Sequence, residues 1–424
     1  QRTDGRFPDI APLGGGFGGM LWGSAGITVP WECYQQYGDT ALLSEHYTAM
    51  KRYIQYIIDQ TIETETNLIV QTRSWGDLCD WLGLEDEKND KSLVWEAYLI
   101  HDLDLMTKMA AALGKTSDAA WFRDLHAARR DFFNKTYIEP ESGKTIFSAF
   151  IPDKKGQPVD IQTSYVLPLA FGIINEENRN KVIANLAETV RRENTTDRGR
   201  LCPSYSLMTG FIGTAWISKA LSDYGLNDLA YRLLQQTDYP SWLYSVEQGA
   251  TTIWERLNSY THTDGFGGNN RMNSFNHYSF GAVGAWMYNY SLGIQRDEAY
   301  PGFKQFILKP MPDPTGKMKY ARGYYDSMYG RIESSWREER GMIHYAFTVP
   351  GNTTLYLPAA SLRDVREGEK LIRKCKGIEY IGEGSGQVVL KLLPGSYSFE
   401  VKKEYPMAGK KRKKGEIARS KGTH

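Results

Sequence analysis

Apolar residues recur three or four positions apart from Trp31 to about Gly293, which is the spacing that places them on one face of an α-helix. The clearest case is residues 40–60, where this stripe comprises Leu42, Leu43, Tyr47, Met50, Tyr53, Ile54 and Ile57. A short helix that Gly38 ends precedes it. The same spacing predicts further helices over residues 92–113, 119–137, 176–193, 213–224, 228–237 and 280–292.

The predicted helices come in pairs of unlike character. Residues 213–221 carry small and apolar side chains nearly all round, whereas their successor, residues 228–236, is amphipathic. Alternation of fully buried and half-exposed helices predicts a double-ring helical toroid, in which loops at one end form the site. A plain helical solenoid is the alternative. The connecting loops disfavour it because they are unequal in length and rich in aromatic residues.

After about Ser291 the pattern changes to apolar residues at every second position, which is typical of strands. We expect an antiparallel β-sandwich. Its predicted extended segments are residues 300–310, 330–337, 342–350, 353–358, 387–392 and 395–401. The predicted domains are a helical domain over residues 1–295, a sandwich over 296–403 and a disordered basic tail over 404–424. A nucleic-acid or nuclear-targeting role for the tail is a less favoured alternative.

Composition excludes several classes of function. Lys and Arg total 51 against 50 for Asp and Glu, a net charge of +1, so the chain as a whole favours no nucleic-acid partner. No apolar run approaches the roughly 20 residues that span a bilayer. The four cysteines are scattered, no histidine pair has metal-ligand spacing, and no Gly-x-Ser-x-Gly elbow follows a strand. We therefore expect no bound metal, no cofactor, and no Ser or Cys nucleophile.

Two short runs carry the candidate chemistry. Residues 246–256 hold two carboxylates, Glu247 and Glu255, the second beside Trp254, and His277 follows in an aromatic cluster. Carboxylates move protons and hold water, and aromatic faces pack against sugar rings, so these runs favour a carbohydrate site. The alternative is two helix starts with buried aromatics. In that case Glu247 would cap the Gly249 turn, and His277 would be a core residue.

The chain resembles the bacterial α-L-rhamnosidases of glycoside hydrolase family 78. The matching stretches are residues 4–12, 22–31, 210–214, 239–242, 247–256, 276–278 and 302–310. The resemblance implies a mainly α chain, with an (α/α)6 barrel followed by the C-terminal antiparallel β-sandwich. It also implies an inverting mechanism, in which two carboxyl groups lie roughly 6.5–9.5 Å apart.

The resemblance implies that Glu255, in the Thr-Thr-Ile-Trp-Glu-Arg motif, corresponds to the family's general base. Glu247 is the alternative candidate for that role. The family's general acid lies just upstream of the Asp-Gly-Arg-Phe-Pro-Asp loop, which here begins at Asp4. The chain opens without an initiator Met, inside what reads as a loop. We therefore expect a barrel that is incomplete at its N-terminus, and no activity from these residues alone.

The resemblance also implies that His277 contacts the sugar. Residues 75–82 depart from the family's tighter Gly-Asp-Trp-Leu pattern, so either Asp77 or Asp80 is the matching acid. The candidate sugar platforms, each of which could equally be core, are Trp22, Trp75 and Trp81. Trp254, next to the predicted base, completes the set of expected substrate-binding residues.

The resemblance therefore implies an exo-acting hydrolase that releases terminal α-L-rhamnose from glycosides or polysaccharides. Two other interpretations remain open. One is a carbohydrate-binding protein without hydrolytic activity, and the other is an (α/α)6 glycosidase or lyase with a different sugar preference. The group that carries the rhamnose is not specified by these patterns, nor is the cellular compartment.

Overall fold

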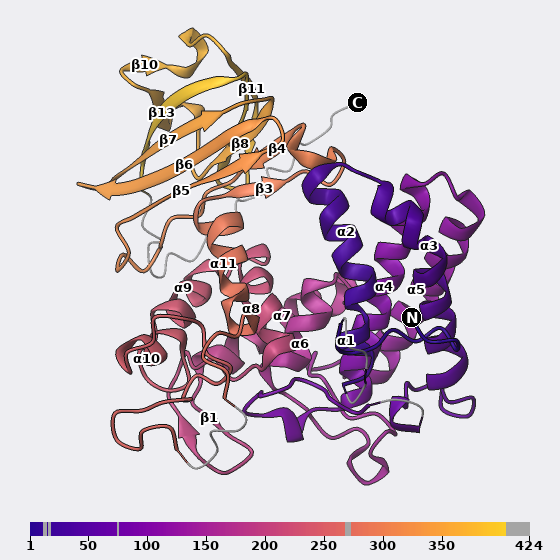
Figure 1. Cartoon of the computed structure of the whole chain (residues 1–424). Coiled ribbons are helices and arrows are strands. Elements are labelled where there is room, and N and C mark those ends of the chain that lie inside the picture. The colour runs from indigo at the N-terminus through magenta and orange to yellow at the C-terminus, as the bar shows by residue number, and fades with distance from the viewer. Residues whose placement is uncertain (12–14, 16–17, 74–75, 268–272, 404–424) are drawn as a thin grey trace, which may run out of the picture.

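A computed structural model describes residues 1–11, 15, 18–73, 76–267 and 273–403. The predicted platform Trp75 and the basic tail lie outside the described residues. The rest forms a helical domain and a β-sandwich, each with its own hydrophobic core (Figure 1). The cores divide near Leu292, which packs in the sandwich, whereas Tyr290 packs among the helices.

The helical domain is built from antiparallel pairs joined by short turns. The pairs are α2 with α3, α4 with α5, α6 with α7 and α8 with α9 (Figure 1). The helices are α1 (Met20–Gly23), α2 (Ala25–Tyr37), α3 (Ala41–Thr61), α4 (Lys91–Ala112), α5 (Thr116–Tyr137), α6 (Gln162–Ala170), α7 (Glu176–Arg191), α8 (Phe211–Asp223), α9 (Asn227–Gln235), α10 (Trp242–Glu247) and α11 (Val283–Trp286). The predicted long helices are confirmed to within a few residues at their ends.

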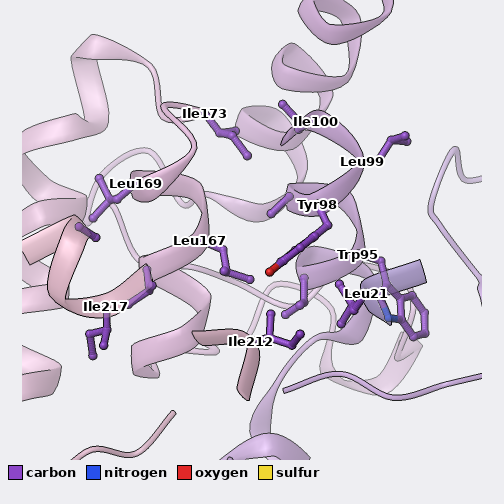
Figure 2. Close-up of a cluster of buried hydrophobic side chains, with 14 of the residues drawn as sticks. Leu21, Trp95, Tyr98, Leu99, Ile100, Leu167, Leu169, Ile173, Ile212 and Ile217 are labelled. Carbon is purple, nitrogen blue, oxygen red and sulfur yellow. The ribbon is translucent and has the colours of Figure 1, made fainter. Parts of the chain in front are cut away.

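One helix of each pair belongs to an inner layer. Helices α2, α4, α6, α8 and α11 contact one another in that order. Figure 2 shows the centre of this layer, where apolar side chains of α4, α6 and α8 meet. The residues labelled there are Leu21, Trp95, Tyr98, Leu99, Ile100, Leu167, Leu169, Ile173, Ile212 and Ile217. The middle helices of this layer are covered on most sides, which explains why α4 and α6 bury residues on every face while α7 is amphipathic. Helix α2, at the end of the layer, leaves Val29 56% exposed.

Three helical predictions need correction. Helix α2 begins at Ala25 and contains Pro30, so it starts earlier than the helical spacing, which begins at Trp31, indicates. Helix α6 was not predicted, because it is short and Pro168 lies inside it. Residues 280–292 are helical, but α11 is flanked by a 3₁₀ turn at Ser279–Ala282 and a π-helical turn at Met287–Ser291.

The sandwich consists of two sheets packed face to face. Their strand orders are β10-β9-β13-β7-β6-β5 and β11-β12-β8-β4-β3, and every pairing is antiparallel except β4 with β8. The strands are β3 (Ile294–Arg296), β4 (Phe306–Leu308), β5 (Tyr320–Ser327), β6 (Gly330–Glu339), β7 (Met342–Val349), β8 (Thr353–Leu357), β9 (Val365–Glu367), β10 (Lys370–Leu371), β11 (Ile378–Gly384), β12 (Gln387–Leu392) and β13 (Gly395–Lys402). The predicted sandwich is confirmed, although β3, β5, β9, β10 and β11 were not predicted.

The sandwich packs against the ends of the helices that lie away from the long loops (Figure 1). The turn at Pro301–Phe303 contacts the end of α2, where Gly38 has a φ of 73° and closes the helix. Arg296 and Glu32 form an ion pair with an Nη1–Oε2 distance of 2.6 Å across this boundary. The indole N–H of Trp336 donates to the carbonyl of Ser291 at 2.9 Å. The long loops therefore lie at the opposite end of the helical domain, next to the starts of α4, α6 and α8.

Candidate active site

A cleft of about 700 Å³ opens among these loops, beside the start of α8. Its walls come from the turn that precedes α4, from the small β1–β2 hairpin (Asn194–Thr195 and Leu201–Cys202) and from the segment after Glu255. The lining residues are Trp81, Leu82, Gly83, Leu84, Asp86, Glu87, Thr196, Asp197, Arg198, Arg200, Leu207, Thr209, Tyr239, Arg256, Leu257, Asn258 and Phe280. The mixture of aromatic and charged groups is typical of a carbohydrate site.

Asp80 anchors the start of α8. Its Oδ1 accepts hydrogen bonds from the backbone N–H groups of Ile212 and Gly213, both at 2.9 Å, and its Oδ2 accepts from Gly210 at 2.8 Å and from the hydroxyl of Thr163. These contacts satisfy donors that a helix N-terminus would otherwise leave unpaired. Burial raises the pKa of Asp80 to about 6.

This enclosure corrects the prediction that Asp80 contacts the sugar. Only 1% of the residue is exposed, and both carboxylate oxygens already accept hydrogen bonds from the protein. The other acid considered, Asp77, is exposed and forms an ion pair with Lys91 at 3.1 Å. Of this run, Trp81 is the aromatic side chain that lines the cleft.

The turn at Trp81 lies very close to the start of α8, and glycine is required there. The N–H of Phe211 donates to the carbonyl of Trp81 at 2.9 Å. A Cβ added to Gly210 would lie 2.3 Å from that carbonyl oxygen and 2.4 Å from the carbonyl oxygen of Asp80, which is closer than any real contact. The Gly210–Phe211 pair therefore fixes the wall that carries Trp81.

The two candidate runs lie side by side. The backbone N–H of Glu255 donates to the carbonyl of Ser274 at 2.9 Å, and the N–H of His277 donates to the carbonyl of Ile253 at 2.9 Å. The Thr252 hydroxyl also donates to the carbonyl of Phe275. The structure thus brings together the two motifs that the sequence separates by some twenty positions.

Glu255 is half-buried and oriented by this pairing. Its Oε2 accepts the backbone N–H of Ser274 at 3.0 Å, while no described residue donates a hydrogen bond to its Oε1. The carboxylate therefore has one oxygen held by the protein and one free to bind water. The neighbouring Trp254 is buried and packs edge-on against Phe275, with ring centroids 5.4 Å apart, so it supports this loop. Its contact with the substrate stays a prediction.

His277 stacks on Phe211, the first residue of α8, with ring centroids 4.7 Å apart and an interplanar angle of 30°. Its Nδ1 faces the backbone N–H of Ser279 at 3.4 Å. The half-exposed ring lines a second, more open cavity of about 450 Å³ together with Ile253 and Tyr278. Because Asp80 fixes the start of α8, it also positions the Phe211 ring against which His277 stacks.

The remaining candidates lie apart from the cleft. Glu247 is exposed at the end of α10, and its backbone carbonyl lies 3.2 Å from the His262 ring nitrogen Nε2. Trp22 is half-buried and packs against the helical core beside Gly18. Neither residue lines the cleft that Trp81 and Arg256 share.

Several residues of the cleft were missed by the sequence analysis. Arg198 and Arg200 stand at the tip of the β1–β2 hairpin, and Asp197, in the same turn, accepts the backbone N–H of Glu87 at 3.0 Å. Burial raises the pKa of Asp197 above its ordinary value. The polar run around Gly199 reads as an ordinary turn in the sequence, so no periodic signal identifies it as a wall of the site.

The described residues contain no group of three or more His, Cys, Asp and Glu side chains that could hold a metal ion. Among the same residues, no helix combines the length and the apolar character needed to cross a membrane.

Comparison with known families decides the relationship. Residues 1–291 match the bacterial α-L-rhamnosidase six-hairpin glycosidase domain, and residues 293–371 match the bacterial α-L-rhamnosidase C-terminal domain. The chain belongs to the bacterial α-L-rhamnosidase family. The predicted six-hairpin barrel and the resemblance to this family are thereby confirmed.

Individual α-L-rhamnosidases agree with this assignment. One from Streptomyces avermitilis is 35% identical over 363 residues, which cover 85% of this chain and 32% of the relative. One from Formosa agariphila is 31% identical over 412 residues, which cover 95% of this chain and 41% of the relative. The crystal structure of a Streptomyces avermitilis α-L-rhamnosidase complexed with L-rhamnose superposes with a TM-score of 0.78 at 31% identity, over 95% of this chain and 35% of that one. The chain thus spans about a third to two-fifths of the length of these relatives.

Proposed function

We propose that the protein takes part in the hydrolysis of terminal α-L-rhamnosidic bonds, with inversion at the anomeric carbon, and that Glu255 is the general base. The observation that carries this proposal is the pairing of the Glu255 and His277 segments beside the start of α8. Family membership supports the choice of sugar.

The geometry of Glu255 suits activation of water. With Oε2 held by the Ser274 N–H, the unoccupied Oε1 can accept a hydrogen bond from one water molecule and take its proton during attack. Inversion requires that this water approach the face of the sugar opposite the departing oxygen, while a second carboxyl group protonates that oxygen. Because Asp80 is enclosed by its four hydrogen-bond donors, it does not serve as that second group.

In this proposal His277 and Trp81 bind the substrate. The His277 ring is held by Phe211 on one face and is half-exposed, so its remaining nitrogen can exchange a hydrogen bond with a sugar hydroxyl. Trp81 gives the cleft an aromatic wall against which C–H groups of a pyranose can pack.

The decisive test is Glu255→Gln in the full-length protein, assayed on p-nitrophenyl α-L-rhamnopyranoside. Loss of a general base typically lowers the rate by about 10²–10⁴-fold, and we expect the affinity for rhamnose to change little. Glu247→Gln is the matched control and should keep the parent rate, because Glu247 is exposed at the end of α10 and takes no part in the pairing with the His277 segment. The opposite result would exchange the two roles. Rhamnose binding without turnover by the parent would favour a carbohydrate-binding protein.

A second test addresses His277. We expect His277→Ala to weaken rhamnose binding with little effect on the unfolding temperature, because its ring is half-exposed. Titration calorimetry and thermal unfolding measured on the same sample separate the two effects. A large drop in unfolding temperature with unchanged affinity would identify His277 as a core residue.

A further inference from the structure

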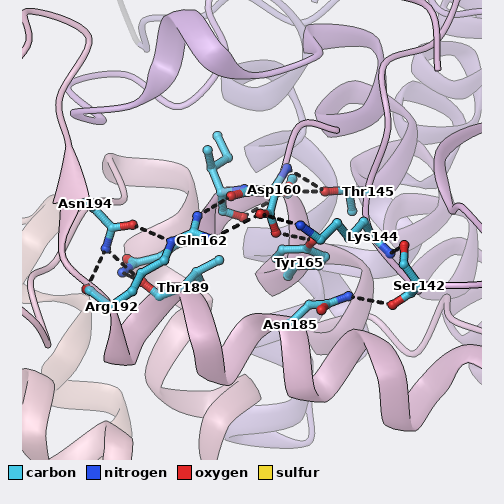
Figure 3. A network of polar contacts seen from close by, with 12 residues as sticks. Ser142, Lys144, Thr145, Asp160, Gln162, Tyr165, Asn185, Thr189, Arg192 and Asn194 are labelled. Atoms are coloured by element: carbon cyan, nitrogen blue, oxygen red, sulfur yellow. Dashed lines mark hydrogen bonds and ion pairs between the residues drawn. The ribbon is translucent and has the colours of Figure 1, made fainter. Parts of the chain in front are cut away.

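One network of charged side chains in the helical domain is satisfied from within. It fixes the segment before α6, where Oδ2 of Asp160 contacts Nη1 of Arg192 and Nζ of Lys144, both at 3.1 Å (Figure 3). The hydroxyl of Tyr165 donates to the other carboxylate oxygen at 2.6 Å. Both oxygens of this acid therefore have partners. The outward side of strands β5 and β6, which we call the β5–β6 face, differs because it combines exposed aromatic rings with charged groups that have no partner.

Three tyrosines stand exposed on or next to β5. Tyr320 is 69% exposed and Tyr324 is 51% exposed, and Tyr329 in the turn between β5 and β6 is 54% exposed. Burial alternates along β5, where Ala321 belongs to the sandwich core, so Tyr320 and Tyr324 point away from that core. Four positions along an extended strand separate the two rings by roughly 13 Å, a distance that a few linked sugar rings can span.

The ring of Tyr324 is held in one orientation. The guanidinium of Arg331 lies over it, 4.0 Å from the ring centroid. Arg331 is itself fixed by Asp326, with an Nε–Oδ1 distance of 2.7 Å and an Nη2–Oδ2 distance of 3.1 Å. The guanidinium thus covers one side of the ring, while half of the residue stays exposed. A ring that is already fixed binds a ligand with little loss of side-chain freedom.

One cation and one anion of the β5–β6 face are left unpaired. Arg322 occupies the outward position between Tyr320 and Tyr324, and Glu333 lies opposite Tyr324 on β6. Neither side chain forms an ion pair or a hydrogen bond with any residue that the structure describes. Both residues are exposed, so each can still bind a ligand.

The β5–β6 face as a whole carries no net charge. Its other charged groups pair with each other, Arg331 with Asp326 at 2.7 Å and Arg337 with Glu339 at 3.2 Å. The unpaired cation and the unpaired anion also cancel. A ligand with a net charge would therefore gain little attraction here. A sugar hydroxyl both donates and accepts hydrogen bonds, so it suits a guanidinium and a carboxylate that lie close together.

Small side chains leave space beside the tyrosines. In the row that crosses the sheet from Arg322, the next three strands contribute Ser335, Ala346 and Ser398. Along β5 and β6, which are described in full, tyrosines are the large apolar side chains that stay exposed, and Met328 stands in the turn between the strands. Aromatic faces attract C–H groups such as those of a sugar ring. A protein interface has a closely packed apolar centre, which a row of serine and alanine does not supply.

We propose that the β5–β6 face binds a neutral polysaccharide chain. Tyr320 and Tyr324 stack on two of its sugar rings, and Arg322 and Glu333 exchange hydrogen bonds with its hydroxyl groups. This site lies on a different domain from Glu255 and does not depend on the role of Glu255 in hydrolysis. It holds the protein on a glycan while the long loops at the far end of the helical domain stay accessible.

Isothermal titration calorimetry on the full-length protein tests this proposal. The probes are xylohexaose, cellohexaose and mannohexaose, which carry no charge and contain no rhamnose, together with hexagalacturonic acid. We expect at least one neutral probe to bind. The double variant Tyr320→Ala/Tyr324→Ala should weaken that binding by about tenfold, as expected when central aromatic contacts are lost.

Tyr356→Ala is the matched control. Tyr356 points outward from β8 in the other sheet, and its ring likewise lies near a cation, with Nζ of Lys309 5.8 Å from the centroid. This variant should keep the parent affinity for the neutral probe. An equal loss of affinity in the control would overturn the assignment to the β5–β6 face.

A salt titration and the unfolding temperature complete the test. Added salt should leave the affinity for the neutral probe unchanged, because salt screens exposed charges and the ligand has none. Binding of no probe, or of hexagalacturonic acid alone, would overturn the proposal. A lower unfolding temperature of the double variant with unchanged binding would mean that another part of the full-length protein covers this face. A dimer that the double variant dissociates, with no binding of the probes, would identify a second copy as the occupant.

Discussion

The helical domain and the sandwich differ in what they bury. The helical domain encloses the carboxylates of Asp80, Asp90, Glu96 and Asp102, each at most 1% exposed. The sandwich core consists of aliphatic and aromatic side chains, and the acid Glu338 lies near the end of β6 between Lys319 and Lys403. The buried carboxylate of Asp313, which is 1% exposed, lies outside this core, in the segment between β4 and β5, where Nε2 of Gln235 in α9 donates to its Oδ2 at 2.6 Å. Both domains are well packed, so burial of charge is not needed for packing as such.

The difference follows from how each element satisfies its backbone. A strand inside a sheet uses its N–H groups in the ladder, whereas the first turn of a helix leaves its N–H groups without partners. Asp90 caps α4 by accepting the N–H of Ser92 at 3.0 Å, and Asp80 does the same for α8. Two of the buried acids in the helical domain, Asp80 and Asp90, therefore fix helix starts, whereas Glu96 and Asp102 lie within α4 and contact Arg129 and Ser24.

The two environments move pKa values in opposite directions. Burial raises the pKa of Asp80, Asp90, Glu96 and Asp102 above the ordinary range. Glu338 is different. Although burial alone would raise its pKa, the ammonium groups of Lys403 and Lys319 hold it below the ordinary value. The stability of the two domains should therefore respond differently to pH.

The largest expected effect is that of Asp80→Ala on the helical domain. The change leaves the buried N–H groups of Gly210, Ile212 and Gly213 without an acceptor, which should cost about 3 kcal/mol of unfolding free energy. Urea unfolding followed by tryptophan fluorescence measures this loss. The control is Ser361→Ala in the sandwich, which removes an exposed cap on the Arg363 N–H and should cost about 0.5 kcal/mol. Similar losses for both variants would contradict the contrast between the domains.

A pH series sharpens the comparison. The pKa of Asp80 rises from an ordinary 3.8 to about 6 on folding, so between these values the folded state holds the proton more tightly. Its contribution to stability is therefore complete below about pH 4 and is lost as the pH rises to about 6. Asp80→Asn should remove this slope, which amounts to on the order of 3 kcal/mol. An unchanged slope in that window would show that other groups cause it.

The smallest effect concerns the sandwich. Glu338→Gln removes the charge that faces Lys319 at 3.2 Å and Lys403 at 2.5 Å, and should cost about 1 kcal/mol or less at neutral pH. Because the pKa of Glu338 is lowered by folding, its contribution is present above the unfolded value and disappears as the pH falls through the folded value. The variant and the parent should therefore converge in acid. A gap that persists at low pH would mean that the glutamate acts through packing.

The long helices were predictable because their apolar residues follow a single period, as in α3, whereas α6 was hidden by Pro168 in a short element. The runs around Glu255 and His277 were identified from their residue types and from the family resemblance, but the backbone pairing between them was not predicted. The period of apolar residues could not reveal the task of Asp80, because its partners at the start of α8 lie some 130 positions away. The sequence analysis missed Arg198 and Arg200 for a related reason, because a polar turn has the same sequence pattern whether or not it borders a cleft.

The close approach at Gly210 limits how such a site can change under mutation. A side chain there would meet the carbonyl oxygens of Trp81 and Asp80 and the amide nitrogen of Gly83 at 2.3–2.4 Å. Saturation mutagenesis at this position should therefore return glycine, whereas Arg198 and Arg200 stand at an exposed tip, where a different side chain meets no such backbone clash. New substrate preferences are consequently expected to evolve through the hairpin, while the start of α8 stays fixed from one descendant sequence to the next.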